Sequence, residues 1–250
     1  MVHIVAMDPI AAGVPLIMQK ADMSLSHLAQ DKSVAVSTIL KLVKDAAKGV
    51  QYMHSRRVVN LDLKEENVLV TDTTDGTTRG MVADLGLAFG VGHMVEAGTG
   101  TPGTIPPECV YEAIPAATSR DVFAFGPMLA GLLMRSGSRN LFLNETNLSP
   151  ADWARVTGGG PIDQDILLGM MHANKIDTSS LDSILVRERV SASVADSNGL
   201  CELIKVCVQP KAEDRPSMET VIDRLDSLLQ AQVQCEAMEA IVAARATRAG

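Results

Sequence analysis

Residues 58–70 have the sequence VVNLDLKEENVLV, in which two short apolar runs flank a polar turn. The turn presents Asp62, Lys64 and Asn67 at offsets of two and three residues. A carboxylate at the mouth of a turn can accept the proton of a hydroxyl group, and an ammonium group beside it can screen a phosphate. An asparagine amide oxygen is a hard ligand that suits Mg²⁺. The stretch therefore indicates chemistry on a phosphate group.

A second polar element follows after another apolar run. It is Asp-Leu-Gly at 84–86, seventeen residues after Asn67. The segment between the two elements is polar and contains Asp-Gly at 75–76, a dipeptide typical of β-hairpin turns. We therefore expect residues 67–71 and 80–84 to pair as antiparallel strands and to bring the two oxygen ligands to one metal site. A solvated hairpin with ordinary surface charges is the alternative interpretation.

In this order and spacing, the two motifs resemble the catalytic loop and the metal-binding D-F-G motif of eukaryotic protein kinases, of the serine/threonine, tyrosine-kinase-like type. The resemblance implies an α+β, protein kinase-like fold with a mainly helical C-lobe and only the last strands of the N-lobe. It also implies a protein serine/threonine kinase, which transfers the γ-phosphate of ATP to a hydroxyl group of a protein substrate.

The same resemblance implies a role for each polar residue of the two motifs. Asp62 would orient the substrate hydroxyl group and take its proton. Asn67 and Asp84 would hold Mg²⁺, and Lys64 would neutralise the γ-phosphate during its transfer. A lysine two residues after the aspartate is typical of serine/threonine kinases rather than tyrosine kinases.

The loop after the second motif ends in GTPGTIPPE at 100–108, which is similar to the kinase pattern G-T-x-x-Y-x-A/P-P-E. This match implies that Thr101 hydrogen-bonds near the aspartate and the lysine of the catalytic loop and so helps to position the substrate. It further implies a buried structural ion pair between Glu108 and Arg215.

The N-terminal residues predict two short strands, at 3–7 and 14–18, joined by proline and glycine turn chemistry. They resemble the last strands of a kinase N-lobe and the hinge that follows, and a helix is expected to begin at Met23, as the first C-lobe helix does. A buried hairpin that leads into a helix fits the same residues. The resemblance assigns four residues to the nucleotide site: Met18 as the gatekeeper, Leu69, and the backbone of Gln19 and Ala21.

Two long helices are predicted in the larger part of the chain. Residues 34–54 carry apolar side chains at three- and four-residue steps, with charged side chains opposite. Residues 119–134 are nearly all apolar after Asp121, which is typical of a central helix. The kinase resemblance implies that Asp121 accepts hydrogen bonds from the backbone of the catalytic loop, and a role as an ordinary helix N-cap is compatible with this.

The sequence predicts a last helix that begins at 214–217, and the region that resembles a kinase ends with this helix. We therefore divide the chain into an N-lobe and hinge remnant at 1–20, a kinase C-lobe at 21–230 and a helical C-terminal tail at 231–250.

The chain also departs from the kinase pattern. No G-x-G-x-x-G motif and no V-A-x-K strand lysine precede the catalytic loop. Asn60 stands where the family usually has histidine, and Leu61 where it has an arginine that grips a phosphorylated activation loop. We therefore expect activity not to depend on that switch. A pseudokinase, or a binding or scaffold module without catalysis, is the alternative, and an incomplete gene model would also explain the missing motifs.

Composition excludes several other classes of protein. The net charge is −8, and no run of basic residues is present, so nucleic-acid binding is disfavoured. No apolar run approaches the roughly 18 residues of a membrane span. The four cysteines lack C-x-x-C spacing, which favours reduced thiols and a cytoplasmic location. The oligomeric state is left open.

Overall fold

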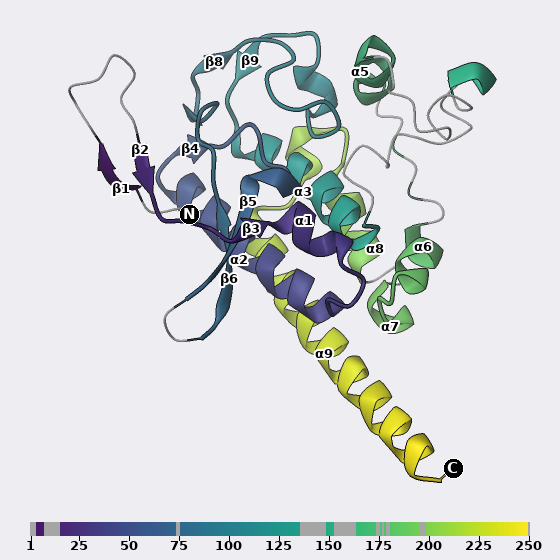
Figure 1. Cartoon of the computed structure of the whole chain (residues 1–250). Coiled ribbons are helices and arrows are strands. Elements are labelled where there is room, and N and C mark those ends of the chain that lie inside the picture. Colours follow the sequence, from purple (N-terminus) through teal and green to yellow (C-terminus); the bar gives the residue numbers. More distant parts are fainter. Residues whose placement is uncertain are drawn as a thin grey trace.

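The structure is a computed structural model that describes residues 4–7, 16–73, 76–135, 149–152, 164–173, 176, 178, 181–195 and 199–249. For residues 4–7, 16–18, 164, 182, 248 and 249 only the backbone is described. A helical body carries short β-ribbons on one side, and a long C-terminal helix extends away from it (Figure 1). This arrangement agrees with the α+β, mainly helical fold expected from the sequence.

Helix α2, Val36–Ser55, matches the helix predicted at 34–54. Its apolar face is buried and packs against β6 (Thr78–Val82) and α9 (Met218–Ala249). The lysines outside this face reach the same neighbours. Lys41 Nζ donates to the Thr78 carbonyl at 2.9 Å, and Lys44 Nζ contacts the Asp226 carboxylate at 2.5 Å. The helix therefore joins the β-hairpin to the C-terminal helix.

Helix α3, Thr118–Leu133, lies at the centre of the body. Every residue from Arg120 to Leu133 is buried, as expected for a helix that is apolar on all sides. At Gly126 an added Cβ would lie 2.6 Å from Val208 Cγ1, so α3 packs closely against the end of α8 (Leu200–Cys207). This central helix carries Asp121 in its first turn.

Helix α1, Leu25–Gln30, begins two residues later than the sequence suggested. Met23–Ser24 instead forms strand β3, which pairs with Leu69 and Val70 of β5 (Val68–Asp72). The Ser24 hydroxyl accepts a hydrogen bond from His27 N and so caps the helix. Strand pairing therefore decides where the helix starts.

Helix α9 is continuous through position 230, where we placed the start of the C-terminal tail. Its first part buries Met218, Val221 and Leu225 against the body. Farther along the helix Gln232 is still buried, whereas Met238 is 61% exposed. The tail is thus the outer half of the last helix of the body (Figure 1).

The remaining helices are short. They are α5 (Gln164–His172), α6 (Leu181–Arg187), α7 (Ala192–Ala195) and the 3₁₀ turns η1 (Glu65–Asn67), η2 (Pro107–Cys109) and η4 (Ala212–Asp214). Within the described ranges, no helix combines the length and the apolar character that crossing a membrane requires.

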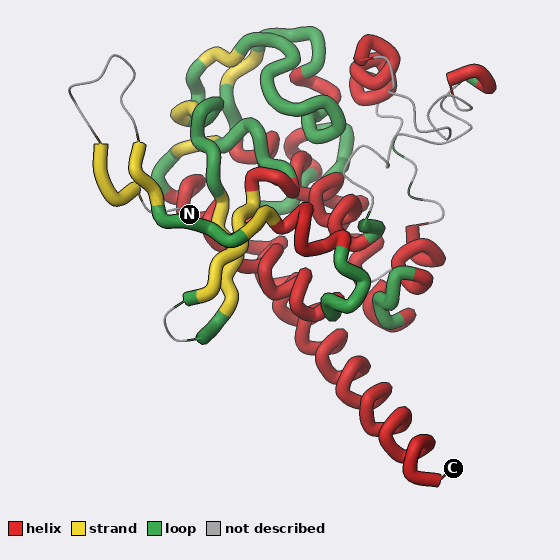
Figure 2. The backbone as a smooth tube through the Cα atoms, in the orientation of Figure 1, coloured by secondary structure: helices red, strands yellow, loops and turns green. Residues whose placement is uncertain are grey.

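The strands form four small antiparallel sheets, drawn in yellow in Figure 2. One contains β3, β5 and β6 in that order. The others are β1 (Ile4–Met7) with β2 (Leu16–Met18), β4 (Val58–Val59) with β7 (Phe89–Gly90), and β8 (Met94–Val95) with β9 (Ile114–Pro115). The first of these three pairs matches the two strands predicted at the N-terminus, although residues 3, 14 and 15 lie outside the described residues.

The hairpin that joins the two motifs is confirmed, with a small shift of its ends. Strands β5 and β6 pair over 68–72 and 78–82, where the sequence predicted 67–71 and 80–84. The hairpin lies directly on α2, because an added Cβ at Gly80 would come within 2.4 Å of the Leu42 carbonyl oxygen. Only a glycine fits at this contact, which fixes the hairpin against the helical body.

Candidate active site

The catalytic-loop candidate is held in place by Asp121. Its buried carboxylate accepts hydrogen bonds from the backbone N–H groups of Asn60 and Leu61, at 2.8 and 2.9 Å. Leu61 has a φ of 66°, a left-handed conformation that is unfavourable for a branched side chain. The two hydrogen bonds stabilise this turn. The N-cap interpretation of Asp121 is wrong, because Ala117 is the N-cap residue of α3.

Asp62, Lys64 and Thr101 form a hydrogen-bonded cluster. Lys64 Nζ lies 2.7 Å from Asp62 Oδ2 and 2.8 Å from Thr101 Oγ1. Thr101 Oγ1 in turn donates to Asp62 Oδ1 at 2.5 Å. The contact between the threonine and the catalytic-loop pair, which the sequence comparison implied, is therefore present. It fixes the orientation of a nearly buried carboxylate, of which only 9% is exposed.

Asn67 joins the cluster through its amide nitrogen. Nδ2 donates to the carbonyl oxygen of Asp62 at 3.0 Å and to its Oδ2 at 3.1 Å. The asparagine sits at the end of η1, the 3₁₀ turn between the catalytic loop and β5. Because the nitrogen is engaged, the orientation of the amide is set and its oxygen is left as the group that can bind a cation.

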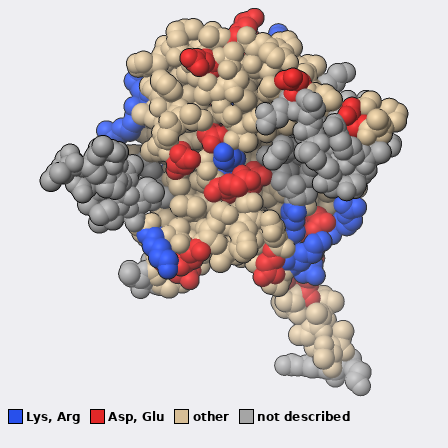
Figure 3. All heavy atoms as spheres, turned by 45° about the horizontal axis from the view of Figure 1, so that its top comes forward, with Lys and Arg blue, Asp and Glu red and all other residues tan. Residues whose placement is uncertain are grey.

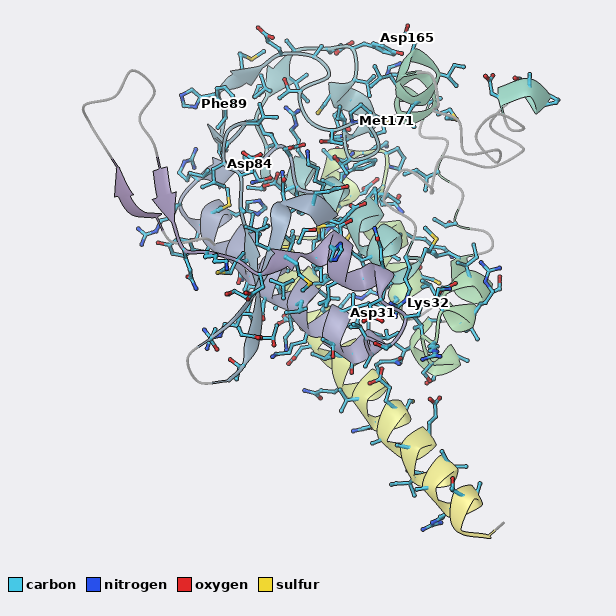
Figure 4. All side chains as sticks on the ribbon, in the orientation of Figure 1. Asp31, Lys32, Asp84, Phe89, Asp165 and Met171 are labelled. Carbon is cyan, nitrogen blue, oxygen red and sulfur yellow. The ribbon has the colours of Figure 1, made fainter. Side chains whose placement is uncertain are left out.

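The hairpin brings Asp84 next to Asn67 in the fold. Ala83 N donates to the Asn67 carbonyl at 2.8 Å, directly beyond the Val68–Val82 pair of the ribbon. Asp84 has a φ of 55°, and its Oδ1 accepts from Gly86 N at 3.1 Å. The side chain is exposed, and it lies below Phe89 in the view of Figure 4.

The side chains of Asn67 and Asp84 are together suitable as ligands for a magnesium ion. Both offer hard oxygen ligands, the amide oxygen of Asn67 and the carboxylate of Asp84. Among the described residues no group of three or more His, Cys, Asp or Glu side chains is suited to hold a metal. Mg²⁺ often takes only one or two protein ligands and completes its shell with phosphate and water oxygens, so a pair of ligands is sufficient.

The segment that carries Thr101 approaches the catalytic loop closely. Gly100 has a φ of 121°, and an added Cβ would lie 2.7 Å from the Leu61 carbonyl oxygen. Thr104, which is buried, donates from its hydroxyl group to the Thr101 carbonyl at 2.9 Å. A glycine and a short threonine turn thus place the Thr101 hydroxyl group against Asp62.

The ion pair between Glu108 and Arg215 is also present. The two guanidinium nitrogens lie 2.7 and 2.8 Å from the two carboxylate oxygens, in a bidentate arrangement. Arg215 is buried, donates to the Gln209 and Pro210 carbonyls, and stacks over the Phe123 ring. The pair joins the end of the 84–108 loop to the segment before α9 and is structural.

Three of the four residues expected at the nucleotide site are described with their side chains. Asp22 N donates to the Val70 carbonyl at 2.9 Å, and Ser24 pairs with Leu69, so the segment after Gln19 and Ala21 runs along β5. Residues 22–24, which follow the connector, therefore lie beside the strand that contains Leu69. For Met18 only the backbone is described, and its predicted gatekeeper side chain lies outside the described residues. The pairing of β1 with β2 fits both the hinge interpretation and a simple hairpin.

Two contacts that shape the site were not predicted from the sequence. His54 lies in the last turn of α2, and its Nε2 lies 2.8 Å from Asp121 Oδ2. Asn60 accepts from Asp62 N at 3.1 Å and is completely buried. The position of His54 in the sequence does not predict its contact with Asp121, because that contact depends on how α2 packs against α3.

The buried thiols do not supply a nucleophile. Burial raises the pKa of Cys109 to about 11 and that of Cys207 to about 12. Both thiols are therefore protonated near neutral pH, and the thiolate is the reactive form. The groups at the site that can do chemistry are carboxylates, an amide, a lysine and a threonine.

The chain was compared with known protein families. A model of the family described as protein kinase domain matches residues 12–225. The chain belongs to the protein kinase domain family. The match covers the catalytic-loop candidate, the hairpin, the 84–108 loop and the start of α9. Membership implies ATP and a divalent metal ion as general cofactors, and proteins as the class of substrate.

This protein kinase domain is similar to several kinases of Arabidopsis thaliana. It is 31% identical over 210 residues to the L-type lectin-domain containing receptor kinase V.9, covering 80% of this chain and 28% of the relative. It is 29% identical over 218 residues to the serine/threonine-protein kinase-like protein CCR4, covering 82% of this chain and 26% of the relative. The chain spans about a quarter of the length of these relatives.

Proposed function

We propose that this chain is a protein serine/threonine kinase, which transfers the γ-phosphate of ATP to a hydroxyl group of a protein. The observation that carries the proposal is the cluster in which Asp62 is bound by Lys64, Thr101 and Asn67. In this cluster an ammonium group, a hydroxyl group and an amide nitrogen all bind one carboxylate. Phosphoryl transfer depends chiefly on such positioning and charge neutralisation.

Each residue of the cluster has a defined part in this mechanism. Asp62 accepts a hydrogen bond from the substrate hydroxyl group and takes its proton as the oxygen attacks phosphorus. Lys64 neutralises charge on the phosphoryl group in transit. Thr101, which already donates to Asp62, holds the carboxylate in one rotamer and lines the place where the substrate hydroxyl group enters.

The proposal assigns Mg²⁺ to the oxygens of Asn67 and Asp84. The ion, when bound, supplies positive charge to the phosphates of ATP. Gln19, Ala21 and Leu69 are proposed to contact the adenine side of the nucleotide. The support is that the chain directly after Ala21 pairs with β5, the strand that contains Leu69. Met18 keeps its proposed gatekeeper role on the basis of the kinase resemblance alone.

Specificity for serine and threonine is supported by Lys64 and Thr101. The lysine two residues after Asp62 bridges the aspartate and the threonine, as the resemblance to serine/threonine kinases implied. The names of several related proteins also describe them as serine/threonine-protein kinases or kinase-like proteins.

The decisive experiment measures phosphate incorporation into a generic acceptor protein by the purified chain with radiolabelled Mg·ATP. We expect Asp62→Asn to lower incorporation by about 10²-fold or more, because it removes the base. Asp84→Ala should lower it as well, through loss of a metal ligand. Glu66→Gln, an exposed carboxylate in the same 3₁₀ turn, is the matched control and should keep the wild-type rate. Incorporation that does not differ between wild type and Asp62→Asn would refute catalysis by this chain.

A second candidate is a kinase-like binding module without catalysis. It is favoured by Asn60 and Leu61, which replace the usual histidine and arginine of the catalytic loop. The same assay separates the two candidates, provided that the circular dichroism spectrum shows a folded chain. A folded chain that binds ATP in calorimetry but gives no incorporation dependent on Asp62 would support the binding module.

We also propose a cytoplasmic location and partners that are proteins rather than nucleic acids. All four cysteines are free thiols, and three of them are buried. Acidic and basic side chains form small separate groups on the face shown in Figure 3, with no broad basic surface for a phosphate backbone. Cell fractionation, and a gel-shift assay with nonspecific DNA and RNA, would test the two parts of this proposal.

A further inference from the structure

Arg120 is a buried arginine in the first turn of α3, directly before Asp121. Only 3% of the residue is exposed. Its Nη2 donates to the Thr99 carbonyl at 3.2 Å, and its Nη1 is buried without a hydrogen-bond partner among the described residues. The side chain belongs neither to the catalytic cluster nor to the ion pair between Glu108 and Arg215.

The burial of this guanidinium group opposes folding. The group stays protonated at physiological pH, and a buried charge loses its hydration. Replacing buried charged groups by apolar side chains of similar volume is often neutral or stabilising. Stability therefore does not account for the burial of Arg120.

Arg120 and Asp121 hold two different segments of the site from one helical turn. Asp121 accepts hydrogen bonds from two backbone N–H groups of the catalytic loop. Arg120 donates to the backbone carbonyl of Thr99, which belongs to the 84–108 loop. This turn of α3 thus binds N–H groups of one segment through an anion and a carbonyl of the other segment through a cation.

The two segments meet at the proposed catalytic base. Gly100 is so close to the Leu61 carbonyl oxygen that an added Cβ would lie 2.7 Å from it. One residue farther along each segment, Thr101 Oγ1 donates to Asp62 Oδ1. The carbonyl that Arg120 binds therefore lies two residues before the hydroxyl group that orients Asp62.

Thr99 lies between two glycines with positive φ angles, 70° at Gly98 and 121° at Gly100. Glycine loses more conformational freedom on folding than any other residue, so a backbone of this kind needs other contacts to stay in one conformation. The N–H and hydroxyl groups of Thr99 both bond to the Glu96 carbonyl, inside the same loop. The guanidinium group of Arg120 ties this part of the loop to the buried central helix.

We propose that Arg120 is a positioning residue for phosphoryl transfer. It holds the Thr99 carbonyl and thereby keeps the Thr101 hydroxyl group against Asp62. The effect on rate rests on the proposed kinase function, whereas the restraint on the loop can be measured in an inactive chain. Arg120 acts on the orientation of the base and not on the residues proposed to bind Mg·ATP, so its loss should lower kcat and leave the KM for ATP within about twofold of wild type.

The first test measures steady-state kinetics of Arg120→Met and wild type with Mg·ATP and the acceptor protein. Methionine has no charge and no donor, so the melting temperature should be equal or higher, while kcat falls about tenfold. Arg120→Lys keeps a charged donor and should recover part of the rate. Arg187→Met, at an arginine whose side chain is 74% exposed on α6, is the matched control and should keep the wild-type rate. An unchanged kcat in Arg120→Met would overturn the proposal.

A double variant shows whether the effect passes through Asp62. Arg120→Met and Thr101→Val both act on the orientation of this carboxylate, so the double variant should be no more than about twofold slower than Thr101→Val alone. Effects that multiply, to a rate about 10²-fold below wild type, would show that Arg120 acts elsewhere and would overturn the proposal.

Hydrogen–deuterium exchange followed by mass spectrometry tests the restraint without catalysis. In Arg120→Met, peptides that cover 96–104 should exchange at least about tenfold faster than in wild type, while peptides from 123–133 keep their rate. Arg187→Met should leave both rates unchanged. If the wild-type chain transferred no phosphate but this exchange rose, the proposed function alone would fail and the restraint would stand. Equal exchange at 96–104 in Arg120→Met and wild type would overturn the restraint itself.

Discussion

The carboxylate of Glu236 binds both the backbone N–H and the hydroxyl group of Ser37, at 3.0 and 2.5 Å. Ser37 lies in the first turn of α2, and the N-cap residue of that helix, Ala35, offers no side-chain hydrogen bond. The missing cap is therefore supplied from α9, across 199 positions of sequence. The outer part of α9 thus contributes to the stability of the helix that precedes the catalytic loop.

Replacing Glu236 by alanine should destabilise the fold by about 1 kcal/mol, the usual effect of removing a helix N-cap. For a domain of this size the loss corresponds to a decrease in melting temperature of about 2–4 °C. Thermal unfolding followed by circular dichroism would measure it. Glu239→Ala is the matched control, since Glu239 is exposed on the same helix. Equal melting temperatures for the two variants would contradict a capping role.

Asp121→Ala should lower the free energy of unfolding by more than Glu236→Ala does, by about 3 kcal/mol or above. The change leaves the buried N–H groups of Asn60 and Leu61 without an acceptor and removes the partner of His54, and each unpaired buried group costs about 1–3 kcal/mol. Urea unfolding would measure the loss. Asp223→Ala, an exposed position on α9, should change stability by less than about 0.5 kcal/mol. If Asp121→Ala also changed the free energy of unfolding by less than about 0.5 kcal/mol, the catalytic loop would hold its conformation without this carboxylate.

Thr101→Val should lower kcat/KM by about tenfold if the chain is a kinase, because Asp62 then loses the hydroxyl group that fixes its rotamer. Thr101→Ser keeps the hydroxyl group and should recover most of the rate. Thr77→Val, in the distant hairpin turn, controls for a general effect of the substitution. Steady-state kinetics with the acceptor protein would measure these values. If Ser and Val at position 101 were equally slow, the hydroxyl group would have no part in positioning Asp62.

The buried thiols predict a loss of stability at alkaline pH. Burial raises the pKa of Cys207 to about 12 from an ordinary value of 9.0, so the unfolded chain loses this proton at a lower pH than the folded chain. Stability is therefore unaffected below about pH 9 and falls as the pH rises above it, by up to about 1.4 kcal/mol per pH unit for this group. Urea midpoints at pH 8 and pH 10.5 would show the decrease. It should be smaller in Cys207→Ala and unchanged in Cys235→Ala, a less buried thiol; a decrease that does not depend on Cys207 would refute the assignment.

Local spacing predicted the parts of the site that are close in sequence. Asp62, Lys64 and Asn67 lie within one turn, so their proximity needed no knowledge of the fold. The Asp-Gly turn predicted the hairpin that brings Asp84 to Asn67, and only its exact ends were wrong. The contacts of Thr101, Glu108 and Arg215 could not come from spacing, and they were expected only because of the resemblance to kinases.

The remaining errors concern contacts between segments that are far apart in sequence. The position of His54 against Asp121 depends on the packing of α2 on α3, which the periodicity of either helix does not specify. Helix α1 begins late because Met23 and Ser24 pair with β5, so a tertiary contact overrides a local helix signal. The burial of Arg120 at the start of α3 likewise depends on the packing of other segments around that helix.

Gly80 is important for the proposed metal site, although it does not belong to the catalytic cluster. The hairpin rests on the Leu42 carbonyl at this glycine, and its two ends carry the residues proposed to bind the metal ion. A side chain at this position would push the ribbon away from α2 and separate those ends. A genetic screen for loss of phosphate transfer should therefore recover substitutions at position 80, and such mutants would be rescued in part by excess magnesium.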